Sequence, residues 1–465
     1  MMMQQVLQYL PEALLGLVAA FALLGIASAY SNRKRASFSL STILLAAISI
    51  ISGYMLASGA NVLILGEVHV YAFSMLFVLL FSVTLALANA LAYAYSKNYH
   101  ELLMLIGFSY AGMCVVATAS SILGVFLGIE VVAIVTSLML LFEGRHRLEA
   151  AAKFFILSSI AAAMFAFGAA LLLQYSPALA LSGITTVWSD ILGASMLLIA
   201  AALGFEAALF PFNLWVPDVY EGAPGHLTAL ISGINKKVAF VAIIEVYFTM
   251  FAIYGHQFSQ IFIVLAVLTM FFGNILALVQ DSVKRMFAYS SISQAGYILV
   301  GIAAASQLGL ESSIFYMIAH AFMIIAAFAL VLWLESKNMH TIEDYSSLGT
   351  KNAFAAAALS VIMLSMAGIP PLIGFTGKFL LFSSAIGSGL AWLAFIGIIN
   401  SFISIYYYAR VMNSMYSGKP SARMLPMDRH VAAVVIFAMA VIILFGIYPQ
   451  PVISAASMAV RSLMI

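Results

Sequence analysis

Charged residues are scarce in this sequence. Asp, Glu, Lys and Arg make up 8% of its 465 residues, whereas hydrophobic residues make up 65%. A soluble globular domain carries about 25% charged residues, so this composition excludes a soluble protein and indicates a polytopic membrane protein. Cysteine is nearly absent as well. The single Cys114 excludes an intrachain disulfide and a metal cluster held by cysteines.

Other absences narrow the function. The eight histidines are scattered and mostly lie between apolar segments, which gives no support for a metal or haem site in this chain. With no soluble domain, a glycine-rich loop that cradles a phosphate is not expected, and nothing indicates binding to nucleic acid. We therefore expect no cofactor and no metal on this chain, with lipids as its surroundings.

The apolar segments are numerous and long. A hydrocarbon core of about 30 Å takes about 20 residues per helix, and the chain offers about 14 such segments. The fold class is therefore all-α, because lipid supplies no hydrogen-bond partner for an open backbone. The expected spans are 6–29, 37–57, 70–95, 102–119, 121–142, 151–174, 190–210, 226–252, 258–279, 286–305, 311–334, 353–385, 388–409 and 431–449.

The basic residues between these spans fall into every second loop. The odd loops, counted from the N-terminus, carry Arg33, Lys34, Arg35, Lys97, Arg145, Arg147, Lys284, Arg285, Lys337, Lys351, Arg410, Lys419, Arg423 and Arg429, and the even loops carry none. By the positive-inside rule the odd loops are cytoplasmic and both termini lie outside the cytoplasm. The first segment has no basic stretch before it and contains Pro11, so we interpret it as a retained helix.

Several ionisable residues lie deep within these spans. Such a group costs about 2.5 to 3.5 kcal/mol to place at mid-membrane, so each is a functional candidate. Glu130, Lys237 and His320 are each about 14 to 20 Å from the nearest loop, and Glu206 is similarly deep. The structural alternatives are a neutral, hydrogen-bonded glutamate at 130 and a hydrogen-bonded interior histidine at 320.

Lys378 follows a double proline, Pro370-Pro371. In a straight helix from Phe354 this lysine would lie about 36 Å along the axis, beyond the far edge of the membrane core. Either it extends to the outer surface, or the helix breaks at the prolines and returns the lysine to mid-membrane. Glu206, followed by Pro211, is a second case of an ionisable residue beside a break.

These two interrupted helices are five spans apart, which predicts a repeat. Because five is odd, the two repeats would be inverted, as in many transporters. The predicted division is three helices in 1–101, a first five-helix repeat in 102–252, a second in 253–412, and a loop with helix 14 in 413–465.

Two further lysines, Lys153 and Lys236, are candidates. Lys153 lies near the cytoplasmic loop, where an interfacial pair with Glu149 is the alternative to a functional role. Lys236 and Lys237 are adjacent and point to different sides of their helix, so one of them is enough for function. Acids, bases and a histidine at one depth suit proton transfer better than binding of a bulky substrate.

Three stretches resemble signature segments of the antiporter-like membrane subunits of respiratory complex I and its relatives. They are GFEAALFPFNLWVPDVYEGAP (204–224), QDSVKRMFAYSSISQAGYILVGI (280–302) and SMAGIPPLIGFTGKF (365–379). Within that family the chain is most similar to the N-type subunit, the homologue of mitochondrial ND-two. The resemblance implies 14 helices in two inverted five-helix repeats, with helices 7 and 12 broken.

The resemblance also assigns roles. Glu130 matches the family's glutamate of helix 5, Lys237 the central lysine of helix 8, His320 a central histidine, and Lys378 the lysine of broken helix 12. Glu206 departs from the pattern, because the family usually has a lysine there. The usual glutamate–lysine pair therefore cannot form in its normal way, and we expect Lys236 or Lys153 to take over part of that pairing.

The expected function is proton translocation in a redox-driven, quinone-reducing complex of the cell membrane. Quinone and iron–sulfur clusters would belong to partner subunits, and the electron donor is left open, as is proton against sodium. The alternatives are a subunit of a multi-subunit cation/proton antiporter or of a membrane-bound hydrogenase, and a non-conducting scaffold.

Overall fold

The computed structural model describes residues 2–31, 33–142, 148–181, 183–184, 187–418 and 424–464. Four of the basic loop residues, Arg145, Arg147, Lys419 and Arg423, lie outside the described residues. The chain divides into two compact units. Unit 1 comprises 1–207, 234–258 and 454–465, and unit 2 comprises 208–233 and 259–453. The predicted repeats have other boundaries, and they remain a prediction.

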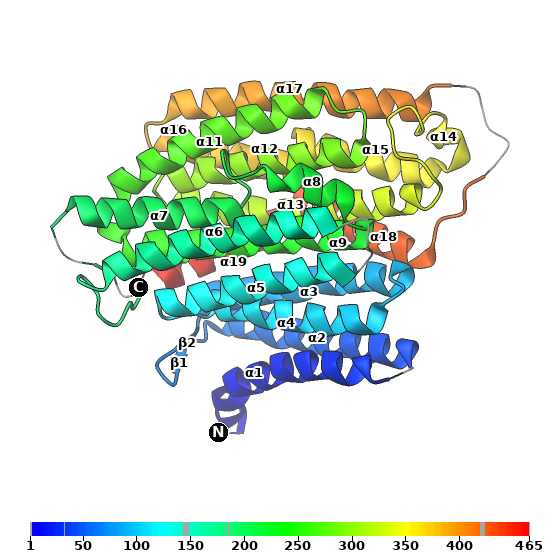
Figure 1. The fold of residues 1–465 in the computed structure, drawn as a ribbon. Coiled ribbons are helices and arrows are strands. Elements are labelled where there is room, and N and C mark those ends of the chain that lie inside the picture. Colours follow the sequence, from blue (N-terminus) through cyan, green and yellow to red (C-terminus); the bar gives the residue numbers. More distant parts are fainter. Residues whose placement is uncertain are drawn as a thin grey trace. The chain divides into compact units, whose positions relative to one another are not determined.

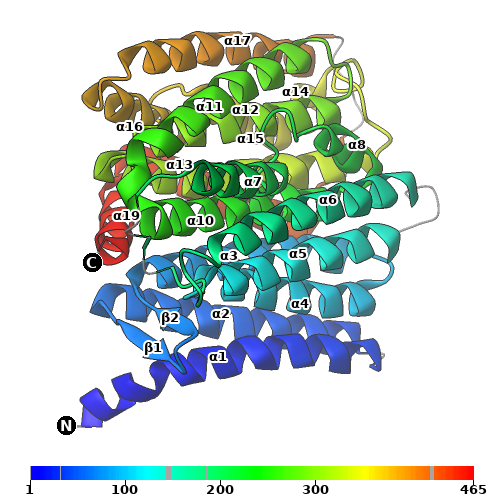
Figure 2. The same cartoon turned by 60° about the vertical axis from the view of Figure 1, so that its left-hand side comes forward.

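Unit 1 is a bundle of helices with one small hairpin (Figure 1). Its elements are α1 (Met2–Ala29), α2 (Lys34–Ser58), β1 (Val62–Ile64), β2 (Val68–Val70), α3 (Ala72–Tyr95), α4 (Tyr99–Ala117), α5 (Ile122–Phe142), α6 (Leu148–Leu172), α7 (Asp190–Glu206), α10 (Lys236–Glu245), a π-helical turn (Val246–Met250), a 3₁₀ turn (Ala252–Tyr254) and most of α19 (Gln450–Leu463). Neighbours pack in the order α2–α1–α4–α5–α6–α7, and α3 covers α2 and α4. The antiparallel strands β1 and β2 lie at the end of α1 that carries the N-terminus (Figure 2).

In the described part of unit 2, the regular elements are helices joined by loops. Its elements are α8 (Trp215–Gly222), α9 (Gly225–Leu230), most of a π-helical turn (Ile231–Asn235), most of α11 (Gly255–Leu278), α12 (Val283–Ala303), α13 (Gln307–Glu335), α14 (Leu348–Lys351), α15 (Ala353–Ala367), α16 (Ile373–Gly387), α17 (Ala391–Tyr416) and α18 (Arg429–Ile447). Helix α13 packs against α9, α12, α15, α16 and α18. Its most apolar stretch is completely buried, so α13 forms the core of this unit.

The predicted fold class is confirmed. Twelve helices of the described chain are long and apolar enough to cross a membrane. The two predicted spans missing from that set are 190–210 and 353–385, which are the two that proline patterns marked as broken. The first is the 17-residue α7, and the second is the pair α15 and α16, with 15 residues each. The shortfall in long helices therefore comes from the interruptions.

Local sequence explains where the interrupted helices begin and end. Ser189 accepts a hydrogen bond from the N–H of Leu192 at the start of α7, and Asn352 does the same for Ala355 at the start of α15. Helix α15 ends at Ala367 and is capped by Gly368, whose φ of 91° favours glycine. Pro370-Pro371 follows and prevents the helix from continuing.

Within each unit, loops of the same parity meet at one end. In unit 1 the even loops are joined by backbone bonds from His69 to Thr118 (2.7 Å) and from Leu181 to Ser120 (2.9 Å). In unit 2 the odd loops are joined by the bond from Ile342 to Asp281 (2.9 Å). This alternation is what the predicted order of spans requires. Which of the two ends faces the cytoplasm stays a prediction.

Candidate functional site: buried ionisable groups at interrupted helices

Two carboxylates share one small cavity in unit 1. Glu130 of α5 and Glu206 of α7 line a space of about 10 Å³ whose other walls are apolar residues of α5, α6 and α7. Both side chains are half-buried, and neither takes part in an ion pair among the residues that the structure describes. The structure thus brings together the two acids that the sequence placed on different helices. When both are ionised they repel each other across this cavity.

Glu206 is the last residue of α7. Helix formation stops there, so the carboxylate lies beside the end of the helix, where carbonyl groups lack their next-turn donors. The break that Pro211 predicted is therefore present, and it lies directly next to the ionisable group.

Lys236 and Lys237 begin α10, directly after the π-helical turn Ile231–Asn235. Both lysines are buried, with 2% and 1% of their surface exposed. Their neighbour Asn235 donates from Nδ2 to the hydroxyl of Thr136 on α5 at 2.7 Å. A π-turn inserts one residue into a helix and often marks a functional position. Here it ends where the two buried lysines start.

Lys153 lies apart from these buried groups. Its ammonium pairs with Glu149 one helical turn away at 2.7 Å, and 45% of its side chain is exposed. This is the interfacial pair that the spacing on α6 predicted as one of two alternatives. Whether Lys153 or Lys236 compensates for the acid at 206 stays a prediction.

Lys378 of unit 2 lies inside the protein, with 3% of its surface exposed. Its Nζ donates to the carbonyl oxygen of Ala367 at 3.2 Å and to the hydroxyl of Ser401 at 2.9 Å. Ala367 is the last residue of α15, so the break supplies a carbonyl without an intrahelical partner to this ammonium. Of the two alternatives for Lys378, extension to the surface is therefore wrong, and return to the interior is correct.

The break also lets the two half-helices approach closely. A side chain at Gly374 would place its Cβ 1.8 Å from the backbone oxygen of Ser365. At Gly368 a Cβ would come within 3.0 Å of the Lys378 side chain. Glycine at these two positions allows α16 to turn back against α15, which positions the lysine.

A network of uncharged polar groups surrounds Lys378 and was not predicted from the sequence. The ammonium lies 4.3 Å from the centroid of the Tyr297 ring. Asn274 contacts the Tyr297 hydroxyl at 3.4 Å, accepts from the Tyr407 hydroxyl at 3.0 Å and donates to Asn400 at 3.0 Å. Asparagines inside apolar spans were the available signal, because buried amides need partners.

A second polar cluster in unit 2 is centred on Gln294. Its amide oxygen accepts from the Tyr316 hydroxyl at 2.5 Å, and its amide nitrogen donates to the carbonyl of Met366 at 3.2 Å. Tyr408 lies 3.4 Å from the same amide nitrogen and also contacts Ser290. These groups are buried donors and acceptors that form a connected chain.

His320 lies on α13 and is 2% exposed. Its position on the fully buried helix of unit 2 agrees with the interior location expected from the sequence. Burial is expected both for a histidine that relays protons and for a hydrogen-bonded interior histidine. The role of His320 therefore stays a prediction.

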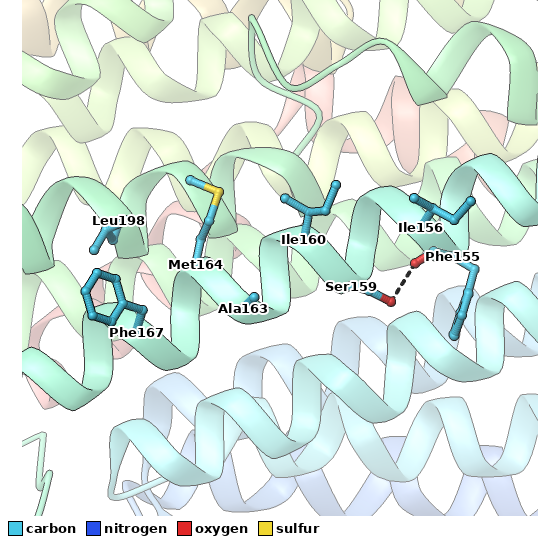
Figure 3. A pocket seen from close by; sticks show the side chains of 8 residues that line it. All are labelled: Phe155, Ile156, Ser159, Ile160, Ala163, Met164, Phe167 and Leu198. Carbon is cyan, nitrogen blue, oxygen red and sulfur yellow. Dashed lines mark hydrogen bonds between the residues drawn. The ribbon is translucent and has the colours of Figure 1, made fainter.

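One pocket of unit 1 is an apolar groove on α6, with a volume of about 610 Å³ (Figure 3). Its only polar side chain is Ser159, whose hydroxyl donates to the carbonyl of Phe155 at 2.8 Å. Since a proton path needs exchangeable groups, this groove is no part of the candidate site. Within the described residues, no group of three or more His, Cys, Asp or Glu side chains is placed so that it could hold a metal ion.

Comparison with known proteins decides the family. Residues 119–404 match the family described as NADH:quinone oxidoreductase/Mrp antiporter, TM. The chain belongs to this family. The matched stretch includes all seven candidate residues and extends from just before α5 into α17. They are Glu130, Lys153, Glu206, Lys236, Lys237, His320 and Lys378.

Individual members of the NADH:quinone oxidoreductase/Mrp antiporter family are similar over most of their length. NADH-quinone oxidoreductase subunit N of Trichlorobacter lovleyi is 36% identical, covering 84% of this chain and 83% of the relative. F(420)H(2) dehydrogenase subunit N of Methanosarcina mazei is 34% identical, covering 83% of each. A chain of respiratory complex I from Thermus thermophilus with bound Aureothin is 25% identical, with a TM-score of 0.83 over 95% of this chain and 98% of its own. The resemblance seen in the three sequence motifs is confirmed.

Proposed function

We propose that this chain is a proton-translocating, antiporter-like subunit of the N type in a redox-driven, quinone-reducing membrane complex. The observation that carries the proposal is the burial of Lys378 at the broken helix, against the carbonyl of Ala367. A lysine kept in the membrane interior by a dedicated interruption is a group that can take up and release a proton. Family membership and the relatives' names support the same function.

Each unit contributes part of a route in this proposal. Glu130, Glu206, Lys236 and Lys237 are the protonatable groups of unit 1, and His320 and Lys378 are those of unit 2. Loading one group with a proton changes the energy of loading its neighbour, since charges in a low-dielectric interior interact strongly. Protons would pass along these groups through intervening water and leave on the outer side near Lys378.

The chain itself would carry no redox cofactor. Electron transfer, quinone reduction and iron–sulfur clusters would belong to partner subunits of the assembly, so the chain serves an enzyme without catalysing a reaction alone. The two named relatives take part in complexes with different donors, NADH and F(420)H(2), so the donor is a property of the partners. The complex would lie in the cell membrane, with the even loops and both termini outside.

The experiment compares two lysines in the complete complex, reconstituted in vesicles with its own electron donor. Lys237→Gln removes a buried charge, and Lys337→Gln removes an exposed loop charge as the matched control. We expect Lys237→Gln to lower the number of protons pumped per electron at unchanged assembly, and Lys337→Gln to pump like the native complex. Equal pumping by both variants would contradict the proposal. Repeating the assay without sodium separates proton from sodium transport.

Two rival functions predict other results. A subunit of a multi-subunit cation/proton antiporter, which the family description also covers, would exchange cations in the vesicles without an electron donor. Genes for iron–sulfur and quinone-site subunits beside this one favour the redox-driven complex over that rival. A non-conducting scaffold predicts that Lys237→Gln reduces the amount of assembled complex and leaves pumping per electron unchanged.

A further inference from the structure

Unit 1 contains a buried carboxyl group that the proposed route does not use. Glu245 is the last residue of α10 and is 0% exposed. It lies eight residues after Lys237, which places it about 12 Å further along the helix. That direction leads toward Met250, which accepts a backbone bond from Ile184 of an even loop at 2.8 Å. Glu245 therefore lies between the buried lysines and the even-loop end of unit 1.

The carboxyl group has one hydrogen-bond donor from a distant part of the sequence. The hydroxyl of Tyr71 donates to Oε1 of Glu245 at 3.3 Å. The other oxygen, Oε2, is buried and has no hydrogen-bond partner among the described residues. Buried oxygens of this kind are rare, and an ionised carboxylate with so few donors is costly. Protonation of the carboxyl group removes that cost.

The backbone holds Tyr71 in place. Tyr71 precedes α3, its N–H donates to the hydroxyl of Ser74 at 2.9 Å, and that hydroxyl donates back to the Tyr71 carbonyl at 2.9 Å. The tyrosine is 4% exposed. Its ring is therefore fixed at the junction between the hairpin and the first turn of α3, with the hydroxyl directed at Glu245.

His69 connects Tyr71 to the surface. The two rings stack with centroids 4.2 Å apart and an angle of 16°, as expected for residues two apart in extended backbone. Nε2 of His69 lies 2.8 Å from Oδ1 of Asn61, an exposed residue. Since an amide oxygen only accepts, Nε2 carries the hydrogen, and Nδ1 is left to gain and lose a proton. Burial lowers the pKa of His69, which favours its neutral, proton-accepting form.

We propose that Glu245 is a further protonation site of unit 1, which exchanges its proton with the even-loop surface through Tyr71 and His69. Its use in pumping rests on the proposed function, whereas the exchange itself does not. In the uptake step, doubly protonated His69 gives its Nδ1 proton through water to the phenolic oxygen, and the phenolic proton passes to Oε1 of Glu245, so His69 returns to its neutral form. One O–H bond breaks on the tyrosine and another forms, so Tyr71 is neutral before and after. The reverse step releases the proton.

Tyr247 provides the matched comparison for Tyr71. It lies two residues after Glu245, is 0% exposed, and its hydroxyl donates to the backbone carbonyl of Met196. Loss of its hydroxyl therefore removes one buried hydrogen bond from the same region of unit 1. The hydrogen bond from Tyr71 to Glu245 stays in place. A purely structural role for Tyr71 predicts that the two tyrosines respond alike.

The test is infrared difference spectroscopy of the complete complex during transfer into heavy water. The C=O band of a protonated carboxylic acid shifts on deuteration, and the band that disappears in Glu245→Gln is assigned to Glu245. We expect Tyr71→Phe to slow deuteration of that band by about 100-fold or more, the scale of losing a positioned proton-transfer group. Tyr247→Phe should exchange at the native rate. His69→Phe, which keeps the stacked ring, should also slow the exchange.

Three results would overturn the inference. They are native exchange in Tyr71→Phe, equal slowing in Tyr71→Phe and Tyr247→Phe, and absence of a carboxylic acid band that depends on Glu245. If Tyr71→Phe does not assemble, His69→Phe decides by the same readout, because its side chain lies on the exposed hairpin. Loss of pumping in Lys237→Gln together with native exchange in Tyr71→Phe rejects this site and leaves the proposed function standing. Native pumping in Lys237→Gln together with slowed exchange in Tyr71→Phe rejects the proposed function and leaves this site standing.

Discussion

The ammonium of Lys378 lies 4.3 Å from the centroid of the Tyr297 ring, and the carbonyl of Ala367 and the hydroxyl of Ser401 accept its hydrogen bonds. The ring face stabilises a cation, and the two oxygens replace part of its water shell. A lysine in this setting can exist in the membrane interior in either charge state, which a proton carrier requires.

Tyr297→Leu should destabilise unit 2, because it removes the ring face beneath Lys378. We expect a loss of about 0.5 to 2 kcal/mol in the free energy of unfolding, the range measured for cation–π contacts. Tyr297→Phe is the control, since it keeps the ring and removes only the hydroxyl, which contacts Asn274 and Ser401. Unfolding in a denaturing detergent measures both. Equal stability of the Leu and Phe variants would show that the ring does not hold the cation.

Gly374→Ala should prevent the close approach of α16 to α15. The added Cβ would lie 1.8 Å from the backbone oxygen of Ser365, so the half-helix must move. We expect a loss of about 3 kcal/mol or more in unfolding free energy, at the upper end for overpacking. Gly387→Ala, at the other end of the same helix, has no atom within 4 Å of its new Cβ and should change stability little. Similar stability of the two variants contradicts the described packing.

Glu206→Gln should lower pumping per electron in the complete complex. The reason is the cavity that Glu206 shares with Glu130, where removal of one acid changes the charge that the other experiences. Glu149→Gln, which changes an exposed acid of the same unit, is the control. If Glu206→Gln pumps like the native complex and Glu130 titrates as before, then the glutamate that replaces the family's usual lysine at 206 has no role in pumping.

Asp344 predicts a pH effect in a loop of unit 2. The N–H groups of Thr341 and His340 donate to its carboxylate at 2.8 and 2.9 Å, and these bonds lower the pKa of Asp344. A lowered pKa means that the loop gains stability above the ordinary pKa of aspartate and loses it as the pH falls through the lowered value. Amide exchange of Thr341 and His340 should therefore speed up at neutral pH in Asp344→Asn. The variant and the native protein should converge in acid, and a constant difference would contradict this assignment.

The sequence predicted the spans, the two interruptions and the depth of the ionisable groups, because each depends on local patterns. Pro370-Pro371 marked the break before Lys378, but the pattern could not show that the carbonyl of Ala367 would accept from this lysine. The π-turn directly before Lys236 contains no proline or pair of glycines, so the sequence does not distinguish it from an ordinary α-helical turn. Tyr71 and Glu245 are 174 residues apart, so only packing reveals their contact.

The central claim is that Lys378 carries protons. The most direct measurement is proton pumping beside the electron-transfer rate in the complete complex with Lys378→Ala, in vesicles, with the amount of assembled complex measured in parallel. The account predicts that pumping per electron, or turnover coupled to pumping, is lost while assembly is intact. Full turnover with unchanged pumping would contradict it and would favour the scaffold.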